Sequence, residues 1–477
     1  MPHDLAEVSA ATTAALVRCG DLSAAATVEA ALLRIESHNP VLNAFTDVTA
    51  ERARHRALAI DAARARGDAL GPLAGVPFGV KNLFDVQGLS TRAGSKINRD
   101  HPAATRDQPL IERLEAAGAV LVGTLNMGEY AYDFTGENIH DGPSRNPHDT
   151  SRMTGGSSGG SGGAVAGRLV PLALGSDTNG SIRVPSSLCG IFGLKSTYGR
   201  LTRARSFPFV ASLDHLGPFA RTASDLALAY DVMQGPDTDD PVCTERPAEP
   251  VSGELHRSAD GLRIALATGY FRTGQFPEAQ AAMARVATAL GVDREIELPE
   301  AARARAAAYL ISATEGAALH LDRLRGRPDD FDPAVRDRLI AGAMVPSALV
   351  VKAHKFRRWY RDRVRELFRD VDIILAPATP CTAPSLGQQF FELDGRRLPV
   401  RANLGLYTQP ISFIGLPVVA VPIPLSRLPI GVQIIAAPWR EDLALRVAYA
   451  LEQAGVAVAP KPNLGAVDER HAESVGS

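Results

Sequence analysis

The stretch GGSSGGSGGAVAGRLVPLALGSDTNGSIRVPSSLCGIFGLKSTYGR (155–200) carries most of the information about the fold. Its apolar segment LVPLAL (169–174) is short and continuous, which predicts a buried strand. The polar patch that follows (175–190) predicts a tight turn around Ser181, with consecutive backbone N–H groups pointing one way. Such a turn can hold the oxygen of a reacting carbonyl, although an ordinary turn with a helix-capping Ser has the same pattern.

The Gly/Ser run at 155–163 fits several kinds of loop. No Lys follows its glycines as a phosphate-binding loop requires, and Val165 stands where a dinucleotide fingerprint needs its last Gly. The pattern of a nucleophile elbow is met at Ser157 and Ser158, but an elbow follows a strand and 146–154 predicts a polar loop. A flexible linker and an ordered functional loop remain. The absence of charged residues from the run favours the ordered loop.

Away from this stretch, helical and strand-like segments alternate, which predicts an α/β layer architecture. Residues 136–163 predict a loop, and the polar, Pro-rich residues 236–261 predict a surface excursion. The basic residues of 350–369 indicate either a solvated helix face or a basic partner surface. The pattern predicts helices over 5–35, 48–66, 106–118, 224–233, 277–291, 300–322 and 350–369, and strands within 72–88 and over 119–126, 169–174, 261–268, 372–380 and 417–423.

Composition limits the class of protein. The chain has 477 residues with 51 Lys and Arg against 53 Asp and Glu, so its charge gives no reason to expect nucleic acid or an anionic membrane as a partner. Its 4 Cys residues form no C-x-x-C pair, which argues against a zinc or redox motif. The first ten residues lack the pattern of a signal peptide, and no apolar run reaches the roughly 18 residues of a membrane span. We expect a cytoplasmic protein without a metal or cofactor.

Several segments together resemble the amidase signature family over residues 5–455. Besides 155–200, they are GVPFGVKNLFDVQG (75–88), GPSRNPHDTSRMTGG (142–156), APATPCTAP (376–384) and LPIGVQIIA (428–436). The resemblance implies a single large α/β/α sandwich around a central mixed β-sheet. We divide the chain into an N-terminal helical segment (1–70), an amidase signature domain (71–460) and a polar tail (461–477).

The resemblance also implies a catalytic triad of Lys81, Ser157 and Ser181. Lys81 would be the base, Ser157, held by a cis peptide, the bridging serine, and Ser181 the nucleophile that forms an acyl-enzyme. A lysine is a base only when neutral, and burial beside apolar residues such as Val80 favours that form. The family builds its oxyanion hole from backbone N–H groups, here those of Thr178, Asn179, Gly180 and Ser181.

Other residues are expected to support the triad or contact the substrate. Asp177 and Arg183 flank the nucleophile and are predicted to pair, which would fix the turn. Thr154 could place a hydroxyl near the site. The supporting or substrate-contacting set is Thr154, Gly156, Ser158, Asp177 and Arg183.

The chain departs from the usual family pattern at a few positions. Asn179 stands where the family usually has Gly; we expect the turn to survive, since Asn tolerates left-handed backbone. Thr154 replaces a Pro, Ser196 follows Lys195 in place of a Pro, and Ser412 replaces an Asn.

Four segments in combination resemble one subfamily, the 1-carboxybiuret hydrolases of cyanuric acid breakdown. They are DTNGSIRVPSSLCG (177–190), SFPFVASLDHLGPFARTASDLALAYD (206–231), TPCTAP (379–384) and TQPISFIGLP (408–417), and they include Asn179 and Ser412. The resemblance implies conversion of 1-carboxybiuret to urea-1,3-dicarboxylate and ammonia, with a small helical partner subunit in a heterotetramer, or a homodimer. The substrate carboxylate calls for a cation, and the arginines near the motifs are Arg145, Arg200, Arg203 and Arg205.

Three other functions remain open. The same relay serves the glutaminase subunit of a tRNA-dependent amidotransferase and other small-molecule amidases. A binding protein without catalytic activity is a third possibility, against which the retention of all three triad residues argues.

Overall fold

A mixed β-sheet forms the centre of the computed structural model, which describes residues 5–464. Within these residues the sheet has 11 strands in the order β1-β3-β2-β6-β8-β7-β14-β15-β11-β9-β10. Strand β2 is parallel to both β3 and β6, whereas β8 runs antiparallel to β6 and β7. The strands are β1 (Phe45–Val48), β2 (Pro77–Lys81), β3 (Val120–Leu125), β6 (Leu172–Asp177), β7 (Phe192–Lys195), β8 (His215–Ala220), β9 (Ile264–Ala267), β10 (Glu295–Ile296), β11 (Ile373–Pro377), β14 (Val418–Ile423) and β15 (Ile430–Ala436).

Helices cover both faces of the sheet. Leu172 and Leu174 of β6 join one hydrophobic core, and Ala173 between them joins the other, because successive strand residues point to opposite faces. The helices are α1 (Ala10–Cys19), α2 (Ala24–Leu42), α3 (Ala50–Ala65), α4 (Pro109–Ala116), α5 (Gly159–Ala166), α6 (Arg183–Cys189), α7 (Ala223–Met233), α8 (Pro277–Leu290), α9 (Ala301–Gly326), α10 (Pro333–Ala343), α11 (Ser347–Leu367), α12 (Val400–Asn403), α13 (Gln409–Ser412) and α14 (Glu441–Gln453). The predicted α/β/α sandwich with a mixed sheet is confirmed.

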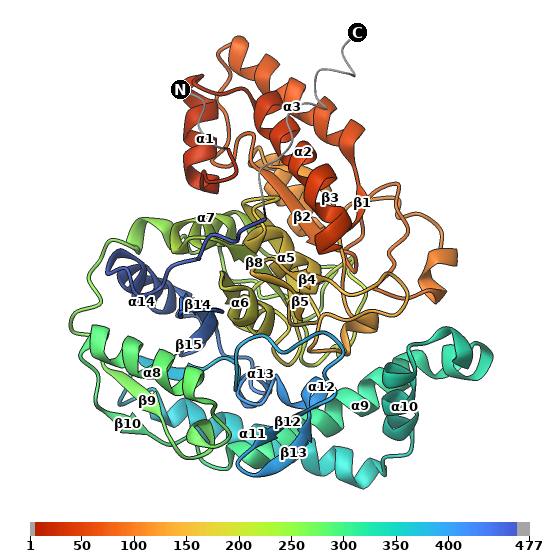
Figure 1. Cartoon of the computed structure of the whole chain (residues 1–477), viewed down its shortest axis with the longest axis vertical. Coiled ribbons are helices and arrows are strands. Elements are labelled where there is room, and N and C mark those ends of the chain that lie inside the picture. Colours follow the sequence, from red (N-terminus) through yellow and green to blue (C-terminus); the bar gives the residue numbers. More distant parts are fainter. Residues whose placement is uncertain (1–4, 465–477) are drawn as a thin grey trace.

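The two layers differ in which parts of the chain they use. Helices α2, α3 and α5 pack on β2 and β3 around the smaller core, whereas α7 and α14 pack on β8, β14 and β15. Figure 1 shows the N-terminal helices at one end of the molecule and α9, α10 and α11 together at the other. Two hairpins lie outside the sheet: β4 (Arg145–Asn146) with β5 (Asp149–Met153), and β12 (Phe390–Leu393) with β13 (Arg396–Pro399).

The predicted helix over 5–35 is wrong as a single element. Gly20 ends α1 with φ of 91°, a left-handed conformation that favours glycine, and its N–H bonds to Leu16 O. Ser23 then begins α2 by accepting a hydrogen bond from the N–H of Ala26.

The Gly/Ser run is neither a linker nor a loop throughout. Helix α5 begins at Gly159 and is fully buried. A Cβ on Gly160 would lie 2.4 Å from Ala44 O, so only glycine allows α5 to pack this closely. The prediction of a polar loop over 146–154 is also wrong, since Asp149–Met153 forms β5; that strand pairs with β4 and not with the central sheet.

The N-terminal part contributes a strand that the sequence did not predict. Strand β1 pairs antiparallel with β3 at one edge of the sheet. The domain boundary at residue 70 stays a prediction, and most of the predicted tail (465–477) lies outside the described residues. Within residues 5–464 no single helix has the length and apolarity to cross a membrane; α10 and α11 meet that criterion only as a pair, bent by 95°.

Candidate active site

The predicted triad residues lie where parallel strands end. Lys81 is the last residue of β2, and Asp177 is the last residue of the neighbouring parallel strand β6. Ser181 lies on the turn from β6 to α6, and Ser157 lies just before α5. The crevice beyond the carboxyl ends of parallel strands is the usual place for a ligand in such sheets.

Lys81 is buried and bonded to two hydroxyls. Its Nζ donates to Ser157 Oγ at 2.6 Å and to Ser176 Oγ at 2.9 Å. Burial lowers the pKa of Lys81 to about 7, although the carboxylates of Asp214, Asp177 and Asp133 act to raise it. A substantial fraction of Lys81 is therefore neutral near pH 7. As the resemblance implies, the peptide bond between Gly156 and Ser157 is cis. Ser176 was not predicted to take part, although it lies within residues 155–200.

The turn before Ser181 presents free backbone amides. Within residues 5–464, no acceptor is hydrogen-bonded to the N–H of Asn179, Gly180 or Ser181. Gly180 has φ of 144°, and a Cβ there would lie 2.1 Å from Thr408 Oγ1. Asn179 does not take the left-handed backbone that we expected of it; only Gly180 in this turn has positive φ. The glycine at 180 therefore makes the unusual turn, and Asn179 needs no strained backbone.

The Ser181 hydroxyl is not yet connected to the other two. Among the described residues it has no hydrogen-bond partner, and its residue is 1% exposed. Hydrogen bonds at a reacting centre often form fully only when the substrate is bound.

Asp177 and Arg183 pair as predicted. Arg183 Nε lies 2.9 Å from Asp177 Oδ2, and both side chains are fully buried. Burial raises the pKa of Asp177, but the charge and hydrogen bonds of Arg183 outweigh it and hold that pKa well below its usual value. Arg183 also donates to Ser412 Oγ and, at 2.7 Å, to Gln433 Oε1. These bonds connect the turn that carries the proposed nucleophile Ser181 (residues 178–181, the nucleophile turn) to α13 and β15.

The other supporting residues bind the backbone. Ser158 Oγ donates to Ser176 O at 3.1 Å, and Thr154 Oγ1 donates to Gly155 O at 3.1 Å. A Cβ on Gly156 would lie 2.5 Å from Asp133 Oδ2, so the segment passes close to that carboxylate. Within residues 5–464, the pocket beside Ser181 is lined by none of Thr154, Gly156, Ser158, Asp177 and Arg183.

The residues that line this pocket come from distant parts of the chain. It contains Ser181, two residues of the same turn, and side chains from α9, α10 and the segment before β4. Its lining residues are Ala131, Tyr132, Asp133, Phe134, Thr178, Asn179, Ser181, Phe209, Tyr309, Ser312, Arg338, Arg401, Ala402 and Gln409.

Two pocket arginines were missed from the sequence. Arg401 Nη1 lies 3.0 Å from Asp133 Oδ1 and so already faces a carboxylate. Arg338 Cζ lies 3.8 Å from the centre of the Tyr132 ring, and its Nε donates to Ala334 O. No carboxylate within residues 5–464 lies within ion-pair distance of Arg338.

The arginines chosen by sequence proximity are engaged elsewhere. Arg145 donates to Thr150 O, and Arg200 donates to Tyr230 Oη and Gln234. Arg203 pairs with Asp240 at 2.9 Å, and Arg205 with Glu112 at 3.1 Å. None of the four lines the pocket of Ser181, although Arg203 lines a neighbouring cavity with Ser176 and Thr178. That one of them binds the substrate carboxylate stays a prediction.

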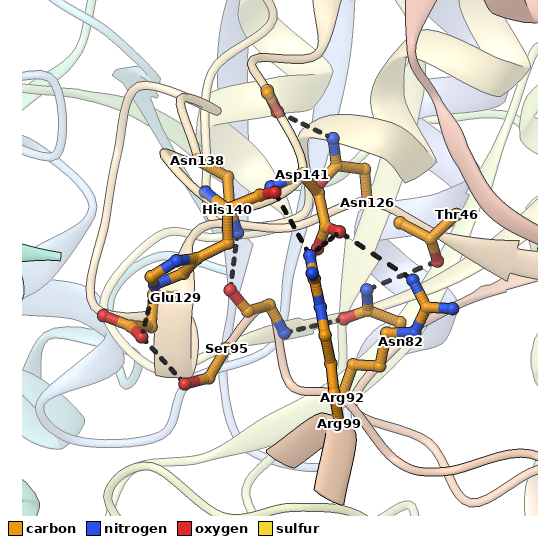
Figure 2. A network of polar contacts seen from close by, with 12 residues as sticks. Thr46, Asn82, Arg92, Ser95, Arg99, Asn126, Glu129, Asn138, His140 and Asp141 are labelled. Atoms are coloured by element: carbon orange, nitrogen blue, oxygen red, sulfur yellow. Dashed lines mark hydrogen bonds and ion pairs between the residues drawn. The ribbon is translucent and has the colours of Figure 1, made fainter. Parts of the chain in front are cut away.

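A polar network fixes the segment that carries Tyr132 and Phe134. In Figure 2, buried Glu129 accepts hydrogen bonds from Ser95 Oγ at 2.8 Å and, in the corresponding tautomer, from His140 Nε2 at 2.9 Å. Glu129 Oε2 also accepts from the N–H of Asp332 at the start of α10, the helix of Arg338. One carboxylate thus joins two walls of the pocket.

Comparison with known proteins places this geometry in a family. A model of the amidase family matches residues 26–445. AtzE, a 1-carboxybiuret hydrolase subunit of Pseudomonas sp. (strain ADP), is 54% identical over 444 residues, which cover 92% of this chain and 97% of that protein. A glutamyl-tRNA(Gln) amidotransferase subunit of Azotobacter vinelandii is 40% identical over 457 residues, covering 89% and 93%.

A solved structure is similar over nearly the whole chain. It is described as an unexpected vestigial protein complex that reveals the evolutionary origins of an s-triazine catabolic enzyme. Its TM-score is 0.94 at 53% identity, covering 95% of this chain and 100% of that chain. The chain therefore belongs to the amidase family, and it is a hydrolase of amide C–N bonds.

Proposed function

We propose that the chain hydrolyses 1-carboxybiuret to urea-1,3-dicarboxylate and ammonia through Lys81, Ser157 and Ser181. The observation that carries the proposal is the buried Lys81, with a pKa lowered to about 7 and 2.6 Å from the Ser157 hydroxyl. The substrate follows from the 54% identity to the 1-carboxybiuret hydrolase subunit.

The first half of the reaction forms an acyl-enzyme. Ser181 Oγ attacks the terminal carbonyl carbon, its proton passes to Ser157 Oγ, and the Ser157 proton passes to neutral Lys81 Nζ. A neutral amine can accept from Ser157 while donating to Ser176, which agrees with the two contacts of Nζ. The proton then returns through Ser157 to the leaving nitrogen, and ammonia departs. In the second half, water takes the place of the amine and releases the dicarboxylate.

The free backbone N–H groups of the turn can stabilise the negative charge that develops on the carbonyl oxygen of the substrate. Those of Asn179, Gly180 and Ser181 have no partner within the described residues, and that of Thr178 lies beside them. Preorganised N–H donors of this kind typically contribute about 10²–10³ in rate each.

Arg338 is the proposed partner of the substrate carboxylate. It lines the pocket and lacks a carboxylate partner within the described residues, unlike Arg401, which faces Asp133. Burial lowers the pKa of Arg338 and the charge of Arg401 adds to that effect, while Tyr132, Tyr309 and the carboxylate of Asp133 oppose it. A desolvated guanidinium with no carboxylate within ion-pair distance favours an anionic ligand.

Substrate assays test the assignment. We expect ammonia release from 1-carboxybiuret with a kcat/KM at least about 100-fold above those for glutamine and a simple aryl amide, and none from Ser181→Ala. Arg338→Met should raise KM for 1-carboxybiuret about 10- to 100-fold. Arg336→Met, on the same helix but paired with Asp337, is the matched control. Preference for glutamine would favour the amidotransferase function, which the 40% identity to the amidotransferase subunit supports.

A heterotetramer with a small helical partner subunit, or a homodimer alone, is part of the proposal. The description of the similar solved structure as a protein complex supports a partner. We propose a cytoplasmic enzyme that binds neither nucleic acid nor membrane directly. Light scattering of the chain, alone and co-expressed with a small open reading frame beside its gene, tests the assembly; a monomer in both cases would contradict it.

A further inference from the structure

The side chain of Asn179 has no part in the proton relay, yet it lies in the pocket beside Ser181. Its residue is 7% exposed and lines the same pocket as Arg338. Its Nδ2 donates to Ser312 Oγ on α9 at 2.8 Å. The nucleophile turn is thus joined to the pocket wall through this amide.

The orientation of the amide is fixed by chemistry. Ser312 Oγ donates its only proton to Ala308 O at 2.8 Å, so toward Asn179 it can act only as an acceptor. The nitrogen of the Asn179 amide must therefore face Ser312, and the alternative with oxygen and nitrogen exchanged would place two acceptors together.

The oxygen of the same amide is left without a donor. Within residues 5–464, no hydrogen-bond donor contacts Asn179 Oδ1, although that atom is buried. A buried acceptor without a partner is unfavourable, and the pocket that Asn179 lines is where a ligand would lie.

We propose that Asn179 Oδ1 accepts a hydrogen bond from the substrate N–H attached to the scissile carbonyl, and so selects acylureas over ordinary amides. This inference rests on the proposed function. Asn179 precedes Gly180 and Ser181 directly, so its side chain is close to the carbonyl under attack. In 1-carboxybiuret the atom on the far side of that carbonyl from the leaving amine is an N–H nitrogen. In glutamine it is a CH₂ carbon.

Asn179 Oδ1 would discriminate between substrates because it stays without a hydrogen bond when the substrate lacks a donor. A CH₂ group at this position cannot donate, so binding such an amide would exclude water from Oδ1 and leave it unsatisfied. A pocket built to hydrogen-bond a substrate group rejects analogues that lack the group much more strongly than an apolar pocket does.

Biuret and malonamide form a matched pair of probes, since they differ only by N–H against CH₂ between the two carbonyls. We expect the wild-type kcat/KM ratio, biuret over malonamide, to be about 100 or more. Asn179→Ala should reduce this ratio at least about tenfold. Ser312→Ala, which removes only the anchor of the amide, should reduce it less, by about threefold. Where turnover is too slow, the ratio of the two inhibition constants against 1-carboxybiuret replaces it.

The controls separate this inference from the proposed function. A folded Asn179→Ala enzyme with an unchanged ratio would overturn the role of Asn179. If that variant does not fold, an unchanged ratio in Ser312→Ala overturns it instead. Failure of the wild-type enzyme to release ammonia from 1-carboxybiuret would overturn the proposed substrate, whatever the probe ratios are.

Discussion

Two buried lysines end two strands of the same sheet, and they differ in what they touch. Lys81 ends β2, and Lys195 ends β7. Both are fully buried, and burial lowers the pKa of each to about 7. Lys81 is bonded to the hydroxyls of Ser157 and Ser176, whereas Lys195 donates to the carbonyl of Ser196 at 3.2 Å and lies near Arg183.

This contrast shows that a lowered pKa alone does not identify a catalytic base. Burial makes both amines available in the neutral form. Lys81 is hydrogen-bonded to the hydroxyl of Ser157, as the proposed relay requires, whereas the bond of Lys195 is to a backbone carbonyl. The two lysines therefore differ in their hydrogen-bond partners and not in their basicity.

The largest expected effect comes from removing each amine in turn. Lys81→Met should lower kcat/KM for 1-carboxybiuret by about 10³-fold or more, because the nucleophile loses its base. Lys195→Met should retain activity within about tenfold of wild type, since no relay group contacts that amine. Steady-state ammonia release measures both, with circular dichroism to verify folding. Equal losses in the two variants would break the comparison.

The two hydroxyls on Lys81 provide the next test. Ser157→Ala should lower kcat/KM by about 10³-fold, because it removes the bridge to Ser181. Ser176→Ala should lower it about tenfold, because Ser176 only accepts from the amine and orients it. The same assay measures both variants. A larger loss in Ser176→Ala than in Ser157→Ala would contradict the assignment of Ser157 as the bridging serine.

The smallest effect concerns stability, in which the two lysines should be alike. Between about pH 7 and pH 10 the unfolded chain binds protons at both lysines that the folded chain does not, since their folded pKa values are lowered from 10.5. The free energy of unfolding should therefore rise with pH across this range. Lys195→Met should reduce the rise by up to about 1.4 kcal/mol per pH unit. Denaturant titration at several pH values measures it; an unchanged slope would contradict the lowered pKa of Lys195.

Sequence reasoning succeeded where the information is local. Lys81 and Ser157 were expected to lie together because each stands in a short motif, and their side chains are hydrogen-bonded. The Asp177–Arg183 pair was predicted because the two residues are only six positions apart and a turn between them brings their side chains together. The apolar runs gave most strands of the sheet, since a strand buried on both faces is continuously apolar.

Sequence reasoning failed where contacts between distant segments of the chain determine which residues line the pocket. Arg338 and Arg401 stand in no motif, and they reach the pocket only because α10 and α12 pack near the nucleophile turn. Asn179 was judged by its backbone, but its side chain and the distant Ser312 proved more informative. Helix α5 was taken for a loop because glycine disfavours helices in isolation, while close packing against Ala44 requires it here.

The dependence of kcat/KM on pH tests most directly the claim that neutral Lys81 is the base. For the wild-type enzyme, we expect kcat/KM for ammonia release to rise about tenfold per pH unit below pH 7 and to level off above it. Lys195→Met should keep this inflection, and the residual activity of Lys81→Met should lack it. An inflection that persists in Lys81→Met, or that disappears in Lys195→Met, would contradict the account.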